Sequence, residues 1–137
     1  MAILRERIEL QLVPLLIRCL GMPRFARLVI SQGLTRVDEA RRRQVTGLIA
    51  DQDPTLMVAA WRAAMAFDSR PRLHEVACPT LVVAGAKDTA VPMHHARMLH
   101  EGIAGSRLVA IDDADHALIW ARPDEFVRVV DAFLDEA

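Results

Sequence analysis

The stretch that decides the fold runs from Pro79 to His116. It begins with PTLVVAGAKD at residues 79–88, passes through a helical pattern, and ends with SRLVAIDDADH at residues 106–116. Each apolar run is short and continuous, which is typical of a strand buried on both faces of a sheet. The first run leads through a glycine to an acid, Asp88, and the second leads into a loop that ends in His116.

The segment between the two runs, residues 92–103, has the apolar spacing of a crossover helix, with Ala96, Leu99 and Ile103 turned inward. Strand, helix and strand predict a right-handed βαβ unit with parallel strands. The carboxyl ends of parallel strands lie at one edge of a sheet, where ligands and catalytic groups collect. We therefore expect Asp88 and His116, 28 positions apart (116 − 88), to meet at that edge.

Helical patterns dominate the two ends of the chain. Apolar residues recur at steps of three and four from Leu4 to Cys19, interrupted by Pro14, and Asp53-Pro54 is a typical helix start. The following helix has an expected packing face of small and apolar residues: Leu56, Ala60, Ala63, Ala64 and Phe67. A last helix from Pro123 is expected to bury Phe126, Val129, Val130, Phe133 and Leu134.

A polar stretch at residues 68–72 separates two kinds of pattern. Residues 1–67 are helical in pattern, and residues 68–137 read as strand, helix, strand and helix. The predicted fold class is therefore α/β, with a helical region at 1–67 and a β-α-β-α region at 68–137.

Composition excludes several classes of protein. With 17 Lys and Arg against 18 Asp and Glu, the net charge of −1 gives no reason to expect a nucleic-acid or anionic-membrane partner. The chain has neither an apolar run of transmembrane length nor a secretory signal, so a cytoplasmic location is expected. Cys19 and Cys78 are expected to be buried thiols, and the spacing of His94, His95 and His100 does not suggest a metal site. We expect no cofactor, since no G-x-G-x-x-G follows either strand.

The motifs at residues 79–88, 92–99 and 108–116 resemble the C-terminal part of the α/β-hydrolase fold family. The resemblance implies that Asp88 is the acid and His116 the base of a catalytic triad, and it implies that residues 1–67 form a lid. The closest likeness is to small-molecule esterases and enol-lactonases. The order of acid before histidine agrees with this family.

The residues alone leave other assignments open. Asp88 could be a turn residue, and the partner of His116 could be Asp112, Asp113 or Asp115. Asp115 stands where a small residue is common in the family, so a tighter or more polar histidine loop is expected.

The serine nucleophile of the family is not found in these residues. The nearest string to Gly-x-Ser-x-Gly is VISQG at 29–33, which has Val29 in place of the first glycine and follows a helix rather than a strand. Ser31 is therefore rejected, and Ser69 and Ser106 lack the required context. The chain is expected to be inactive alone, as half of a hydrolase of small esters or lactones. The alternatives are a non-catalytic assembly or binding module, or a truncated fragment of a full-length hydrolase.

Two parallel strands cannot cover both edges of their own sheet, and an unpaired edge invites pairing with another chain. The hydrophobic fraction, 53%, is also slightly high for a domain of this size. We therefore expect a homo-oligomer or a complementary chain that covers an edge of the sheet and the apolar face at residues 12–16.

Overall fold

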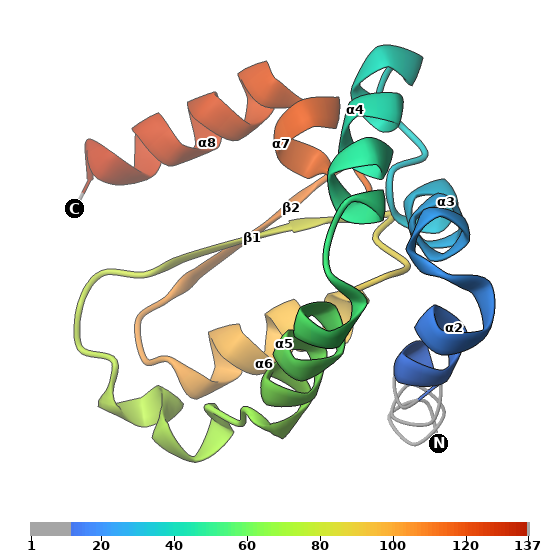
Figure 1. Cartoon of the computed structure of the whole chain (residues 1–137). Coiled ribbons are helices and arrows are strands. Elements are labelled where there is room, and N and C mark those ends of the chain that lie inside the picture. The colour runs from blue at the N-terminus through green and yellow to red at the C-terminus, as the bar shows by residue number, and fades with distance from the viewer. Residues whose placement is uncertain (1–11, 137) are drawn as a thin grey trace. The chain divides into compact units, whose positions relative to one another are not determined.

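The computed structural model describes residues 12–136, which form two compact units (Figure 1). Residues 12–31 and 39–68 make the first unit, and residues 32–38 and 69–136 make the second. The part of the predicted first helix before residue 12 lies outside the described residues. None of the helices in the described part is long and apolar enough to cross a membrane.

The first unit is helical. Its elements are α2 (Val13–Leu20), α3 (Met22–Gly33, whose last two residues belong to the second unit), α4 (Glu39–Ala50) and α5 (Pro54–Ala66). Ile17, Met22 and Phe25 form a buried cluster, and the partly buried residues around it are Val13, Leu16, Ile49, Met57 and Val58. As expected, Asp53 is the N-cap of α5, and its carboxylate accepts hydrogen bonds from the backbone N–H groups of Thr55 and Leu56.

The predicted packing face of α5 is wrong. Leu56 and Phe67 are 71% and 76% exposed, and the helix instead packs through Met57 and Val58. The reason is that α5 is apolar around most of its circumference, so hydrophobicity alone does not single out one face. The two cysteines also differ from expectation, because both are exposed.

The second unit contains the sheet. Its elements are η1 (Arg70–Glu75), β1 (Leu81–Gly85), α6 (Met93–Gly102), β2 (Arg107–Ile111), α7 (Leu118–Ala121) and α8 (Pro123–Leu134). The strands are parallel, in register from Leu81 opposite Arg107 to Gly85 opposite Ile111. Helix α6 contacts both strands and α8 contacts β2, on opposite sides of the sheet (Figure 1). The predicted α/β class with a parallel β-α-β-α unit is confirmed.

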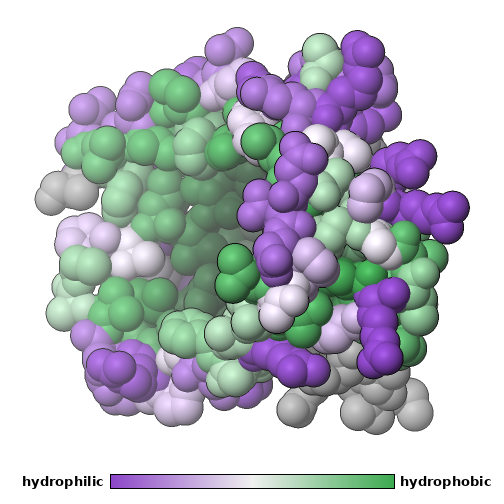
Figure 2. Space-filling view, in the orientation of Figure 1, coloured by the Kyte–Doolittle hydropathy of each residue, from purple (hydrophilic) through white to green (hydrophobic). Residues whose placement is uncertain are grey.

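The strands are less covered than their apolar sequences predict. Residues 81–84 of β1 are all only partly buried, and the expected buried position Leu134 of α8 is 64% exposed. Figure 2 shows hydrophobic surface below α8, in the region of the two strands. The physical reason is that the sheet has two strands within the described residues, so each strand has a neighbour on one side alone.

Gly85 ends β1 at a point of close backbone approach. A Cβ atom at this position would lie 2.5 Å from the carbonyl oxygen of Asp115 and 2.6 Å from that of Ala114. Both neighbours are backbone atoms, which cannot move aside as a flexible side chain can. Glycine is therefore required for the loop after β2 to pack against the end of β1.

We expect Gly85→Ala to lower the free energy of unfolding by about 2 to 3 kcal/mol, because it forces the loop at 114–115 away from β1. The control is Gly47→Ala in α4, where a Cβ would meet no atom within 4 Å. That change should raise the stability by up to about 1 kcal/mol, since alanine favours a helix. Urea unfolding followed by circular dichroism measures both, and a neutral Gly85→Ala would contradict the close approach.

Candidate active site

Backbone hydrogen bonds hold the loops after β1 and β2 against each other. The N–H of Ala86 donates to the carbonyl oxygen of Ile111 at 3.0 Å, and the N–H of Lys87 donates to that of Ala114 at 2.8 Å. These bonds continue the contact between the strands beyond the last paired residues. As a result, the side chains that follow each strand are carried to the same edge of the sheet.

Asp88 is held from both carboxylate oxygens. Its Oδ1 accepts hydrogen bonds from the N–H groups of Ala90 and Val91, both at 2.8 Å, and its Oδ2 lies 3.0 Å from Nδ1 of His116. The side chain is only 9% exposed. Asp88 is thus a turn residue and the partner of His116 at once, because a carboxylate has enough lone pairs for both.

His116 extends from the loop after β2, and its side chain is 49% exposed. Within the described part of the chain, the ring of His116 makes one hydrogen bond, to Asp88. An ionised carboxylate can only accept, so Nδ1 carries the proton in this bond. In the neutral ring Nε2 is then the nitrogen with the available lone pair, which is the arrangement required of a general base.

The three other acids of the loop do not contact the ring of His116. Asp113 forms ion pairs with Arg36 and Arg122, and Asp115 bonds to Thr35, Arg36 and Ala117. Asp112 is exposed. The geometry therefore brings together Asp88 and His116, the two residues selected from the sequence, and gives Asp113 and Asp115 other partners.

Asp115 is the buried acid of this region, with 3% of its surface exposed. Its Oδ2 accepts the Thr35 N–H at 2.7 Å, the Thr35 hydroxyl at 2.8 Å and the Arg36 N–H at 3.0 Å, and its Oδ1 accepts the Ala117 N–H at 3.0 Å. Burial raises the pKa of Asp115, but these hydrogen bonds outweigh burial and hold the pKa below its usual value of 3.8. The sequence indicated a more polar loop here, but it did not reveal Thr35 as the partner, 80 positions away.

The serines lie in other settings. Ser31 is within α3, where its hydroxyl donates to the carbonyl oxygen of Leu28 at 2.8 Å. Ser106 contacts His100, with Oγ 2.9 Å from Nδ1 and 3.1 Å from the His100 carbonyl oxygen. This contact closes the C-terminal turn of α6 before β2 begins, at the opposite end of that strand from His116. A hydroxyl group that donates its proton to a carbonyl oxygen at the end of a helix is typical of a helix cap.

The rings of His94 and His95 lie with their centroids 4.1 Å apart and their planes tilted by 36°. Among residues 12–136, no group of three or more histidine, cysteine or acidic side chains is arranged to hold a metal ion.

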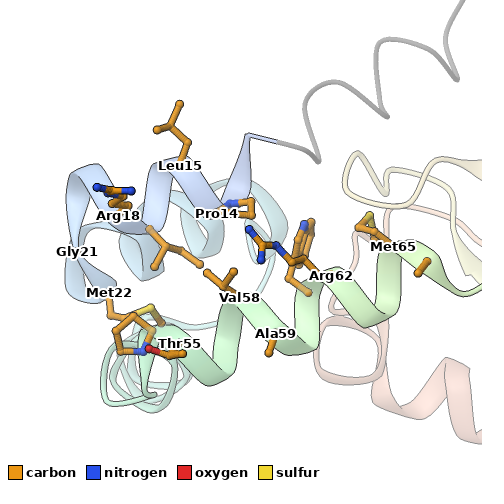
Figure 3. A pocket seen from close by; sticks show the side chains of 14 residues that line it. Pro14, Leu15, Arg18, Gly21, Met22, Thr55, Val58, Ala59, Arg62 and Met65 are labelled. Atoms are coloured by element: carbon orange, nitrogen blue, oxygen red, sulfur yellow. The ribbon is translucent and has the colours of Figure 1, made fainter.

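A groove in the first unit runs between α2 and α5 and has a volume of about 1070 Å³ (Figure 3). Its lining includes Leu15, Met22, Val58, Trp61 and Met65. Figure 3 shows the side chain of Arg62 directed from α5 toward α2. Trp61 and Met65 therefore line a surface groove rather than a closed core.

The comparisons with known proteins agree with this architecture. The sequence model of the alpha/beta hydrolase family matches residues 6–129, which is most of the chain. The chain belongs to the alpha/beta hydrolase family.

Three relatives illustrate the match. A 2-hydroxy-6-oxononadienedioate/2-hydroxy-6-oxononatrienedioate hydrolase of Klebsiella pneumoniae is 43% identical over 70 residues, which are 51% of this chain and 24% of that protein. The serine hydrolase BPHL of Mus musculus is 46% identical over 59 residues, or 43% of this chain and 20% of that protein. The crystal structure of the enol-lactonase from Burkholderia xenovorans LB400 superimposes with a TM-score of 0.76 and 27% identity, covering 90% of this chain and 48% of that one.

The chain thus spans about half the length of this solved relative. The sequence matches to the two curated proteins cover a smaller share, about a quarter or less of each.

The lowered pKa of Asp115 predicts a pH-dependent stability. Its stabilising effect should be complete above the ordinary pKa of 3.8 and should be lost as the pH falls through the lower pKa of the folded state. Urea unfolding of the unmodified protein and of Asp115→Asn, at several pH values between 2 and 6, measures the difference in stability. That difference should narrow toward the acid end, and a difference that widens there would contradict the prediction.

Proposed function

We propose that Asp88 and His116 are the acid and the base of a serine-hydrolase triad that acts on small esters or lactones. The nucleophilic serine is supplied by residues outside this sequence, on a longer chain or on a partner chain. The observation that carries the proposal is the 3.0 Å contact between His116 Nδ1 and Asp88 Oδ2, at the carboxyl ends of adjacent parallel strands. Membership of the alpha/beta hydrolase family supports it.

In the proposed mechanism each group has one role. Nε2 of His116 takes the proton of the serine hydroxyl as its oxygen attacks the substrate carbonyl carbon, and then gives that proton to the leaving oxygen. Asp88 holds the ring with Nδ1 protonated and stabilises the imidazolium that forms. Water then attacks the acyl-enzyme by the same route, so no cofactor takes part.

The substrate class rests on the relatives. The neighbour solved from Burkholderia xenovorans is called an enol-lactonase and the murine relative a serine hydrolase. We infer a small acyl substrate, and we infer that residues 1–67 serve as the lid region and residues 68–137 as the part that carries the acid and the base.

The test starts from the DNA upstream of the Met1 codon. The proposal expects a Gly-x-Ser-x-Gly segment there or in a separately encoded partner, and a fluorophosphonate probe should label the completed protein. His116→Ala and Asp88→Asn should each lower kcat for short p-nitrophenyl esters by roughly 10³- to 10⁴-fold. The 137-residue chain alone should remain unlabelled.

The matched control is His100→Ala. His100 bonds to Ser106 at the amino end of β2, away from the proposed triad, so its loss should change kcat by less than about threefold. Stoichiometric labelling of the 137-residue chain, or full activity of His116→Ala, would contradict the proposal. Phenotypes or partner binding that survive both triad substitutions would instead favour the non-catalytic assembly module.

The sheet also suggests a partner. We propose that a second copy or a complementary chain covers an edge of the β1–β2 sheet and the apolar face at residues 12–16, where Leu12 and Leu15 are 46% and 55% exposed. An open strand edge and an exposed apolar face each favour such association.

Light scattering at micromolar concentration should give a mass above the 15.3 kDa of one chain. Leu15→Arg should shift the mass toward that of the monomer, because it places a charge in the proposed interface. Leu48→Arg is the control, since Leu48 is similarly exposed, at 59%, but lies outside that face. A stable monomer in the unmodified protein would refute the association.

A further inference from the structure

We propose that Asp115 is a positioning residue for His116. It fixes the loop that carries the imidazole by tying that loop to the segment at residues 34–37, which connects α3 and α4 along the chain. The inference rests on the proposed function for the catalytic importance of His116. Whether Asp115 holds His116 in place can be tested without any catalytic assay.

The carboxylate of Asp115 acts on both sides of His116. Its Oδ1 accepts the N–H of Ala117 at 3.0 Å, which closes a turn of three residues with His116 in the middle. Its Oδ2 accepts three hydrogen bonds from Thr35 and Arg36, at 2.7 to 3.0 Å. The hydrogen bonds of one buried side chain therefore hold the backbone directly before and directly after His116.

The segment at the other end of these bonds is itself well anchored. Leu34 and Val37 are buried, with 6% and 9% of their surfaces exposed, and they flank Thr35 and Arg36 on either side. Asp115 consequently attaches the loop that carries His116 to a segment of the same compact unit that is itself held by two buried side chains.

His116 needs such support because its own ring is poorly packed. Nearly half of its side chain is exposed, and its single hydrogen bond within residues 12–136 is the one to Asp88. An exposed side chain loses rotamer entropy when it is held in place, so a backbone that can shift would let the ring leave Asp88. A shift of about 1 Å is enough to impair a catalytic geometry.

Asp113 offers a natural comparison. It lies in the same loop and also reaches Arg36, through an ion pair, but its side chain is 53% exposed. Exposed ion pairs contribute little to stability, whereas a buried carboxylate with four hydrogen bonds leaves several donors unsatisfied when it is removed. The support for His116 should therefore come from Asp115 and not from Asp113.

The test reads the imidazole of His116 directly by ¹⁵N NMR of the 137-residue chain. At a pH where the ring is neutral, the unmodified protein should show the tautomer with Nδ1 protonated, as the bond to Asp88 requires. Asp115→Ala should lose this preference and give the mixture of tautomers of an unrestrained histidine. The amides of Thr35, Arg36 and Ala117 should exchange with solvent at least roughly tenfold faster.

Three milder variants accompany Asp115→Ala. In Asp115→Asn one oxygen can still serve Thr35 and Arg36, but the amide nitrogen then faces the N–H of Ala117, so the loss should be partial. Thr35→Val removes the hydroxyl that donates to Asp115 Oδ2 without changing the shape of the side chain, and Thr35→Ser restores that hydroxyl and should restore the tautomer. Asp113→Asn is the matched control and should leave the His116 signal unchanged, since asparagine tolerates the φ of 56° at that position.

The outcomes separate the two proposals. If the unmodified chain lacks the Nδ1-protonated tautomer, the pairing of His116 with Asp88 fails, and the proposed function fails with it. If the unmodified chain shows it and a folded Asp115→Ala keeps it, the positioning role is refuted while the proposed function stands. Should Asp115→Ala not fold, the Thr35→Val and Thr35→Ser pair decides: loss followed by restoration supports the role, and an unchanged tautomer in Thr35→Val overturns it.

Discussion

The parallel pairing of β1 with β2 is the constraint on which the second unit depends. The register, from Leu81 opposite Arg107 to Gly85 opposite Ile111, sets the height at which each following loop leaves the sheet. A slip of one residue would move one loop by about 3.3 Å and turn the strand's side chains to the opposite face. Neither change is compatible with the 3.0 Å contact between Asp88 and His116.

Two carboxylates close to this edge have different surroundings and therefore different roles. Asp88 uses one oxygen to hold its own turn and presents the other to His116. Asp115 is more deeply buried and directs both oxygens at backbone N–H groups and a hydroxyl. A buried charge persists only where hydrogen bonds replace the lost water, and the four hydrogen bonds that Asp115 accepts from Thr35, Arg36 and Ala117 meet this condition.

The relation to the alpha/beta hydrolase family explains the uneven burial of the second unit. This chain corresponds to about half the length of the solved enol-lactonase, and β1 is only partly buried although its sequence is continuously apolar. An apolar strand in a parallel sheet is selected for cover on both faces and for neighbours along both edges. The described residues give β1 one neighbouring strand, and the hydrophobic surface around it in Figure 2 is the consequence.

The sequence by itself determined the elements and their order. Two short apolar runs around a helical pattern were enough to predict β1, α6 and β2, and the positions of Asp88 and His116 followed, because parallel strands end at one edge. Local patterns carry this information, since hydrophobic periodicity and turn residues act over a few positions. The same patterns did not identify the packing face of α5, because a helix that is apolar on most sides gives no preference.

Only the tertiary structure decided which acid faces His116 and what Asp115 holds. Four aspartates, Asp88, Asp112, Asp113 and Asp115, were possible partners by sequence, and the register of the strands selected Asp88. The bonds from Asp115 to Thr35 join residues 80 positions apart, which no local pattern encodes. Such a contact depends on where the folded chain returns in space, so it becomes visible only when the whole unit is assembled.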